Sequence, residues 1–126
     1  MSQENSALEI AERFFDAYNR ADTEAMGSLL ADDLSFGHHN RFRGTGKAKM
    51  LATFSHFADQ IPGRRYNPVL RFSAGPDFIF CEHTWTGVPK EDSTEWGWKA
   101  GEEFTGEVLT VLGFRDGLIT EWYDYG

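Results

Sequence analysis

The sequence predicts an α+β fold in which three helices come first and pack on one face of an antiparallel sheet. Two observations carry this prediction. Apolar residues recur at helical spacing through the first half of the chain, and apolar strand patterns joined by short turns fill the second half. Helices followed by consecutive strands are typical of a sheet that is covered on one side. With 126 residues, we expect a single domain over residues 1–126.

The three predicted helices each have a start or stop signal. Asn5 and Ser6 are candidate caps for a helix whose apolar residues run from position 7 to 18. Asp22 or Thr23 caps a short second helix, which the acidic pair at 32–33 ends. The third helix covers residues 47–61, and Pro62 with Gly63 stops it.

The predicted strands are separated by recognisable turns. Asp116-Gly117 is typical of a two-residue hairpin turn, and residues 75–77 form another turn. The polar segment 89–101, which contains Trp96 and Trp98, is expected to be a long loop. The strands are expected at residues 34–39, 66–74, 78–88, 102–114 and 118–125, with residues 41–46 as a loop.

Composition narrows the possible partners. The net charge is −8, and an acidic surface repels phosphate groups, so we expect no nucleic acid and no membrane as a partner. The single cysteine, Cys81, excludes an internal disulfide and any multi-cysteine metal site. Acidic residues near the start argue against a signal peptide, and a cytoplasmic location is expected.

Four stretches of sequence resemble the nuclear transport factor 2-like superfamily, which includes SnoaL-like polyketide cyclases, ketosteroid isomerases, limonene epoxide hydrolases and scytalone dehydratases. They are residues 10–19 (IAERFFDAYN), Asp22 with residues 29–33 (LLADD), the set Phe36, Gly44 and Lys47, and residues 114–125 (FRDGLITEWYDY). The resemblance implies a cystatin-like cone, in which a strongly curved antiparallel sheet encloses a cavity that the helices close. One fold hosts many chemistries, so the resemblance alone does not fix the function.

The resemblance also sorts the strand residues into two faces, because side chains alternate along a strand. Leu34, Phe36, His38, Ile79, Cys81, His83, Trp85, Val108, Thr110, Leu112, Trp122 and Asp124 are expected to point into the cone. Phe78, Phe80, Leu109, Val111, Ile119 and Tyr123 are expected on the outer face. An apolar outer face needs covering, so we expect a homodimer through it.

Three inward residues are the candidate catalytic groups. His38 lies where ketosteroid isomerases have their catalytic aspartate, and an imidazole can move protons near neutral pH. Asp124 lies where limonene epoxide hydrolases have an aspartate, and burial among aromatic residues would raise its pKa. His83 is expected to face Asp124 across neighbouring strands, and the resemblance adds that scytalone dehydratases use two histidines in such a cavity.

Each candidate also has a structural interpretation. His38 is alternatively a hydrogen-bonded residue at a strand end, and His83 a core histidine paired with Thr110 or a backbone carbonyl. Asp124 alternatively pairs with Arg41 or Arg43 near the cavity mouth. The two histidines with Asp124 resemble a ligand set for iron or zinc, but no spacing motif supports a metal, and we expect none.

Other parts of the relatives' sites are absent. The isomerase tyrosine corresponds to Phe14, its protonated acid to Thr110, and the hydrolase Arg-x-Asp to residues 83–85, so neither mechanism carries over intact. Cys81 is interpreted as a small core residue rather than a nucleophile. The expected ligand-binding residues are Phe14, Tyr18, Phe36, Phe54, Cys81, Trp85, Thr110 and Trp122. Trp96 and Trp98 form either a flap over the cavity mouth or a dimer contact.

Two functions remain open from the sequence. The first is an enzyme without a cofactor that performs acid/base proton transfer on a small apolar carbonyl or hydroxyl compound, as a cyclase, isomerase or dehydratase does. The second is a binding protein that holds such a molecule in the same aromatic pocket and does no chemistry. A protein-interaction domain is a third, weaker interpretation, since no residue of the sequence points to a particular partner.

Overall fold

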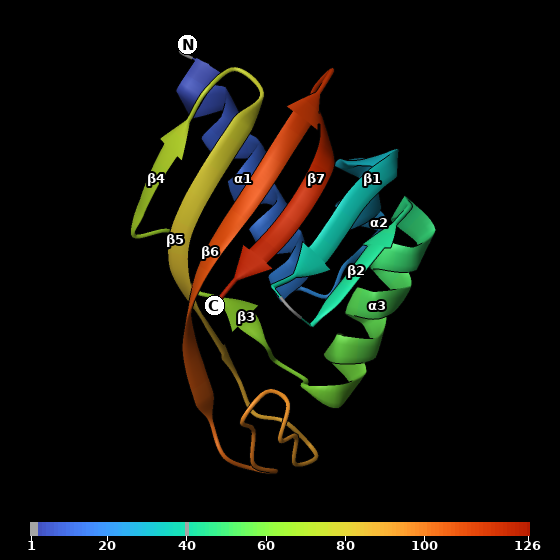
Figure 1. The fold of residues 1–126 in the computed structure, drawn as a ribbon, viewed down its shortest axis with the longest axis vertical. Coiled ribbons are helices and arrows are strands. Elements are labelled where there is room, and N and C mark those ends of the chain that lie inside the picture. The colour runs from blue at the N-terminus through green and yellow to red at the C-terminus, as the bar shows by residue number, and fades with distance from the viewer. Residues whose placement is uncertain (1–2, 40) are drawn as a thin grey trace.

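The computed structural model describes residues 3–39 and 41–126, and it confirms the α+β architecture (Figure 1). The helices α1 (Gln3–Asn19), α2 (Thr23–Ser28) and α3 (Lys47–Gln60) pack against one side of the sheet. The strands are β1 (Leu30–His38), β2 (Phe42–Thr45), β3 (Arg65–Tyr66), β4 (Arg71–Ala74), β5 (Phe78–Gly87), β6 (Phe104–Arg115) and β7 (Leu118–Tyr125). None of the described helices is both long and apolar enough to cross a membrane.

All the strands belong to one seven-stranded sheet. Its order is β2-β1-β7-β6-β5-β3, and β4 pairs with β5 further along. The β1–β7 pairing is parallel, whereas the other pairings of the described strands are antiparallel. The sheet is therefore mixed rather than purely antiparallel, because the last strand inserts between β1 and β6 instead of ending at an edge.

Two predictions near β1 are wrong. The second helix ends at Ser28, and β1 begins at Leu30, so Asp32 and Asp33 are exposed strand residues rather than a helix end. The main-chain N–H of Ile119 donates to the Leu29 carbonyl, so β7 draws this segment into the sheet. The expected loop at residues 41–46 contains β2, which forms a hairpin with β1.

The long strand predicted at residues 66–74 is divided into β3 and β4. Pro68 lies in the interval and has no N–H to donate to a neighbouring strand. The backbone N–H groups of Asn67 and Leu70 still donate to the Thr84 and Glu82 carbonyls. The segment therefore stays beside β5 without forming a continuous ladder.

The helix caps and turns are partly as predicted. α1 already starts at Gln3, so Asn5 and Ser6 do not cap it. Asp22 caps α2 as expected, accepting a hydrogen bond of 3.0 Å from the Ala25 N–H. Asp116 and Gly117 both have positive φ, of 55° and 78°, which confirms the two-residue hairpin turn.

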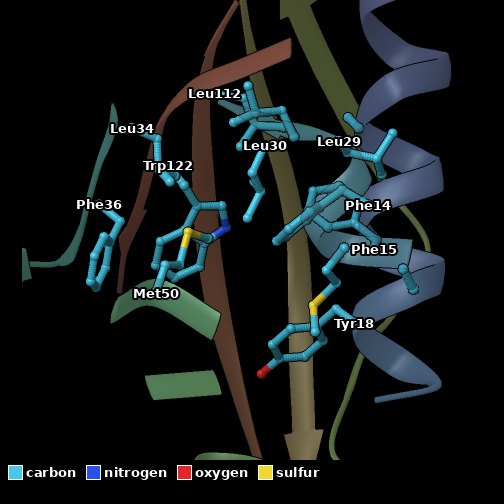
Figure 2. Packing of buried hydrophobic residues seen from close by; sticks show 14 of the residues in the cluster. Phe14, Phe15, Tyr18, Leu29, Leu30, Leu34, Phe36, Met50, Leu112 and Trp122 are labelled. Carbon is cyan, nitrogen blue, oxygen red and sulfur yellow. The ribbon is translucent and has the colours of Figure 1, made fainter. Parts of the chain in front are cut away.

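The core lies between the helices and the inner sheet face (Figure 2). Every residue expected to point inward is buried or half-buried. Ile119 was expected outside and is fully buried instead. The register with β6 pairs Gly113 with Glu121 and Phe114 with Ile119, which leaves Thr120 as an extra residue. This β-bulge reverses the alternation, so Ile119 faces the core.

The outer sheet face carries exposed apolar side chains. Phe80, Leu109 and Tyr125 are each about two-fifths exposed, at 43%, 39% and 38%. Phe78, Val111 and Tyr123 lie half-buried on the same face, as the alternation predicted.

Candidate active site

An apolar cavity of about 160 Å³ lies at one end of the cone. An apolar cavity of about 150 Å³ is enough for a benzene ring. Its walls come from α1, α3, the inner faces of β5–β7 and the connection between β5 and β6, which extends beyond the sheet at the bottom of Figure 1. The aromatic lining residues are Tyr18, Phe42, Phe54, Phe57, Tyr66, Trp85, Trp96, Trp98, Phe104 and Trp122.

Asp124 is the buried carboxyl of this cavity and is only 5% exposed. Its Oδ2 accepts a hydrogen bond from the Tyr66 hydroxyl, and its Oδ1 accepts one from Thr110 Oγ1, both at 2.5 Å. Burial raises the pKa of Asp124 to about 7, although both hydrogen bonds favour the charged form and lower it. A carboxyl with this pKa can both accept and return a proton near neutral pH.

His83 is joined to Asp124 through Thr110. Its Nε2 lies 2.8 Å from Thr110 Oγ1, whose own proton is donated to the carboxyl. Thr110 then accepts from Nε2–H, which leaves Nδ1 as the unprotonated nitrogen. Nδ1 is buried and has no hydrogen-bond partner among the described residues, and burial lowers the pKa of His83 to about 4. His83 is thus neutral near pH 7 and lies behind the cavity wall.

His38 lies beside Asp124 in the parallel β1–β7 register and lines the same cavity. The edge-to-face contact with Trp96 places the two ring centroids 4.7 Å apart. Its Nδ1 lies 3.4 Å from Arg41 Nη1. Burial, reinforced by the charge of Arg41, lowers the pKa of His38 to about 4, so this imidazole is also neutral near pH 7.

The connection between β5 and β6 brings two tryptophans over the cavity. Trp96 and Trp98 stack on each other with centroids 5.1 Å apart, and Trp98 stacks on Trp85 at 5.8 Å. The Arg41 guanidinium lies 4.4 Å from the Trp96 ring centroid and donates to the carbonyl oxygens of Glu95 and Gly126. These contacts support the flap interpretation of Trp96 and Trp98.

Tyr18 occupies the α1 side of the cavity. Its hydroxyl oxygen accepts a hydrogen bond of 2.9 Å from Trp85 Nε1–H. The guanidinium of Arg64 lies over the Tyr18 ring, with Cζ 4.0 Å from the centroid. Tyr18 and Tyr66 are neighbours, since their ring centroids are 4.5 Å apart.

The structure places the predicted site residues in two groups. His38, Asp124, Tyr18, Phe54, Trp85 and Trp122 line the cavity together. The others are buried in the core and do not line the cavity: Phe14, Phe36, Cys81, His83 and Thr110. Figure 2 shows Phe14 and Phe36 within this packing. Burial raises the pKa of the Cys81 thiol to about 12, which agrees with a core residue.

Sequence reasoning missed the two residues that contact Asp124 and Tyr18 most directly. Tyr66 was expected only as the start of a strand, and Arg64 was not among the expected site residues. Both come from the short segment between α3 and β4, where no periodicity marks the inner face. The arginine alternative for Asp124 is not found, because its side-chain partners are Tyr66 and Thr110. Within residues 3–39 and 41–126, no cluster of three His, Cys, Asp or Glu is placed to hold a metal ion.

A curved sheet closed by helices around an aromatic cavity defines the nuclear transport factor 2-like class of fold. Within this class, the chain belongs to the SnoaL-like domain family, which it matches over residues 11–122. No curated protein matches the sequence.

Several solved structures share the fold at low sequence identity. A protein of Xanthomonas campestris, provisionally assigned as a polyketide cyclase, is 20% identical, with a TM-score of 0.87 over 99% of this chain and 93% of that one. An LEH-like epoxide hydrolase of M. tuberculosis is 21% identical, with a TM-score of 0.79 over 96% and 82%. A hypothetical protein of Catenulispora acidiphila with a ketosteroid isomerase-like fold, in complex with trimethylamine, is 21% identical, with a TM-score of 0.78 over 94% and 85%. These similarities establish the shared fold only. The activity has to be inferred from the residues of the site.

Proposed function

We propose that the protein is an enzyme that needs no cofactor and transfers a proton on a small apolar compound bearing a carbonyl or hydroxyl group. One observation carries this proposal: Asp124 is a buried carboxyl in the wall of an aromatic cavity, held by two hydroxyl donors, with a pKa of about 7. A carboxyl buried only for stability would be costly, since water solvates its charge better than the cavity does. Proton transfer near neutral pH needs a group whose pKa lies close to that pH.

The histidines have subordinate roles in this proposal. His38 lines the cavity as a neutral imidazole and serves as a second proton acceptor or hydrogen-bond donor for the substrate. His83 acts through Thr110, whose hydroxyl it helps to orient towards Asp124. Asp124 is therefore the main acid/base group, because its pKa lies closer to neutral pH than the pKa of either histidine.

The test is proton exchange with solvent. Ring-sized ketones and hydroxy-ketones are incubated in D₂O, and loss of the ¹H signal on carbon is followed by NMR. We expect the wild-type protein to accelerate exchange or dehydration of at least one compound, and Asp124→Asn to reduce that rate by at least about a hundredfold, the usual size of a general acid/base contribution. Glu121→Gln is a matched control, because Glu121 is an exposed carboxyl three residues before Asp124 on the same strand.

The non-catalytic alternative gives a different result. If ligands perturb the tryptophan fluorescence but neither exchange nor dehydration occurs, the cavity binds without chemistry. The stack of Trp85, Trp98 and Trp96 favours this alternative, since it supplies a binding surface that needs no acid/base group. Equal rates for wild type and Asp124→Asn would remove Asp124 from the mechanism.

We also propose that the outer sheet face forms a homodimer. Leu109 on β6 lies opposite Tyr125 on β7 and diagonal to Phe80 on β5, and these exposed apolar side chains lie on a chain whose net charge is −8. A second copy would cover these side chains with a surface of the same composition.

A further inference from the structure

Arg41 carries a positive charge at the rim of the aromatic cavity. It lies in the turn between β1 and β2, is half-buried, and is the one lysine or arginine among the described residues that line the cavity. No aspartate or glutamate in the described part of the chain forms an ion pair with it. The guanidinium therefore keeps a charge that no acidic side chain neutralises.

Hydrogen bonds use the Arg41 guanidinium only in part. Nη1 lies 3.4 Å from His38 Nδ1 and donates to the Gly126 carbonyl oxygen at 3.3 Å, while Nη2 donates to the Glu95 carbonyl oxygen at 3.5 Å. All three contacts are longer than the roughly 2.8 Å of a guanidinium–carboxylate hydrogen bond. Within the described chain, Nε has no hydrogen-bond partner. Donor capacity therefore remains for a ligand.

Trp96 holds the guanidinium in a fixed orientation. The Cζ atom of Arg41 lies 4.4 Å from the centroid of the Trp96 ring. A guanidinium that lies on an aromatic face keeps its N–H groups at its edge, where they match the two oxygens of a carboxylate. Because this group is already oriented, less side-chain entropy is lost when an anion binds to it.

The sequence around the cavity rim is basic, although the chain as a whole is acidic. Residues 34–58 contain no aspartate or glutamate and four cationic side chains: Arg41, Arg43, Lys47 and Lys49. Lys47 pairs with Asp32, but the other three form no ion pair with a described acidic side chain. On a chain of net charge −8, this region attracts small anions and repels small cations.

We propose that Arg41 binds the carboxylate of a ligand whose apolar ring occupies the cavity. This inference rests on the proposed function for the cavity as the substrate site, and it narrows the substrate class to ring compounds that carry an acid group. The cavity volume of about 160 Å³ limits the apolar part to roughly one six-membered ring. A phosphate dianion fits less well, because His38 is neutral near pH 7 and the lining supplies no second cation.

The same contact would orient the ligand. Arg41 is half-buried, whereas Asp124 in the same cavity is 5% exposed and lies deeper. His38 connects the two levels, since it contacts Arg41 and pairs with Asp124 in the β1–β7 register. A ring whose carboxylate is bound by Arg41 at the rim would extend past His38 towards Asp124. Arg41 is thus a binding residue that determines specificity, and it takes no part in proton transfer.

The test compares benzoate, benzamide and benzamidine, which are planar single-ring compounds of nearly equal shape with a negative, no and a positive charge. Isothermal titration calorimetry is carried out at about pH 6, where Asp124 with a pKa of about 7 is mostly protonated and benzoate is ionised. We expect the wild-type protein to bind benzoate about tenfold more tightly than benzamide, the size of a hydrogen bond to a charged group. Benzamidine is expected to bind most weakly.

Variants assign the preference to Arg41. Arg41→Met is expected to lower the benzoate-to-benzamide affinity ratio about tenfold, and the ratio is used because a loosened flap would weaken both ligands alike. Arg41→Lys is expected to give an intermediate ratio, since it keeps the charge but loses the planar fork. Arg43→Met is the matched control, because Arg43 belongs to the same basic region but is exposed and lies over Tyr123 on the outer face.

Three outcomes would overturn the inference. The first is a wild-type protein that binds benzamide or benzamidine at least as tightly as benzoate. The second is an equal fall of the ratio in Arg41→Met and Arg43→Met, which would assign the preference to the general field of the basic region. The third is a ratio that is lost in Asp124→Asn but kept in Arg41→Met, which would mean that the protonated Asp124 carboxyl binds benzoate.

Failure of this inference and failure of the proposed function give different results. An Arg41-dependent ratio without solvent exchange on any compound would leave the carboxylate site standing and remove the catalytic role of Asp124. Solvent exchange that depends on Asp124, together with binding that does not depend on ligand charge, would leave the proposed function standing and overturn the role of Arg41.

Discussion

At the scale of single residues, the cavity depends on polar groups that are expensive to bury. Among the described residues, Asp124 is bound by two hydroxyl donors and by no cation, and Arg64 lies over the Tyr18 ring without a carboxylate in ion-pair distance. Buried charges in proteins are normally paired. The burial of Asp124 in the cavity wall is easier to explain by what the cavity does than by stability, since an apolar residue of equal volume would stabilise the fold at least as well.

Replacing Asp124 by asparagine should change how stability depends on pH. The pKa of Asp124 is about 7 in the folded protein against an ordinary value of 3.8, so the protonated carboxyl favours the folded state. That contribution is complete below about pH 4 and is lost as pH rises through about 7. Relative to wild type, Asp124→Asn should therefore gain unfolding free energy between these limits, on the order of 4 kcal/mol.

Urea unfolding of both proteins at a series of pH values measures this difference. His38 and His83 have lowered pKa values and stabilise the folded state above their ordinary pKa of 6.5, but they are present in both proteins and cancel. If the difference in unfolding free energy between the two proteins does not vary with pH, the Asp124 carboxyl has an ordinary pKa and is not the acid/base group of the cavity.

Removing the Thr110 hydroxyl should raise the pKa of Asp124 further. Its hydrogen bond favours the charged carboxylate, so Thr110→Val should move the titration above pH 7. The loss of a buried hydrogen bond should also cost about 1–3 kcal/mol of stability. ¹³C NMR of the carboxyl follows the titration. Thr86→Val is the matched control, because Thr86 is a buried threonine that bonds Thr105 and Asn67 instead; an equal shift in both variants would exclude a direct effect.

Strand alternation predicted the buried inward residues except Ile119, where the β-bulge reverses it, but it did not predict which of them reach the cavity. His38, Trp122 and Asp124 were expected to point inward, and the structure places all three on the cavity wall. The partners of Asp124 could be predicted only in part: Thr110 shares its face on the next strand, whereas Tyr66 lies 58 positions away on a two-residue strand. Arg64 carries no sequence signal, because its burial depends on packing against Tyr18 rather than on any local pattern.

At the scale of elements, the existence of the three helices was the most predictable feature and the element boundaries were the least predictable. α3 begins at the predicted residue, Lys47, and Asp22 caps α2. Leu30 was expected in a helix, because Leu29 and Leu30 continue its apolar spacing, but pairing with β7 extended β1 to include it. Long-range pairing of this kind overrides local propensity, and a single sequence does not reveal it.

The contribution of the Asp22 cap to the stability of α2 can be tested directly by substitution. Asp22→Ala removes the acceptor of the Ala25 N–H and should lower the unfolding free energy by about 1 kcal/mol. Asp16→Ala is the matched control, because Asp16 also bonds Arg20 but caps no helix. Thermal unfolding monitored by circular dichroism measures both. Equal losses in the two variants would assign the effect to the Arg20 pairs rather than to the cap.

Arg41 should determine how firmly the tryptophan flap is held. It joins the β1–β2 turn to Glu95, Trp96 and Gly126. Arg41→Ala removes a cation–π contact worth about 0.5–1 kcal/mol, so a single-ring aromatic ligand such as 4-nitrophenol, if held under the flap, should dissociate roughly two- to fivefold faster in stopped-flow measurements. Arg43→Ala is the control, because Arg43 lies over Tyr123 on the outer face. Identical rates in both variants would show that the flap is held by the tryptophans alone.

At the scale of the whole molecule, the outer sheet face is the surface through which we propose that two copies associate. Leu109→Lys places a charge among the exposed apolar side chains of this face and should convert a dimer of about twice 14.3 kDa into a monomer. Sedimentation velocity measures the mass. Val88→Lys is the control, because Val88 is similarly exposed, at 41%, but lies after the end of β5. A wild-type protein that sediments as a monomer at high concentration would contradict the dimer.

The central position of β7 has a consequence for how the chain is made. β7 ends at Tyr125, yet it lies between β1 and β6, and β1 begins at Leu30. During synthesis, β1 to β6 therefore leave the ribosome before β7, which is the strand that joins the two halves of the sheet. Until then β1 and β6 each present an unpaired edge, which is the kind of surface that chaperones bind and that aggregates in their absence. The nascent chain should thus depend on protection until its last strand emerges.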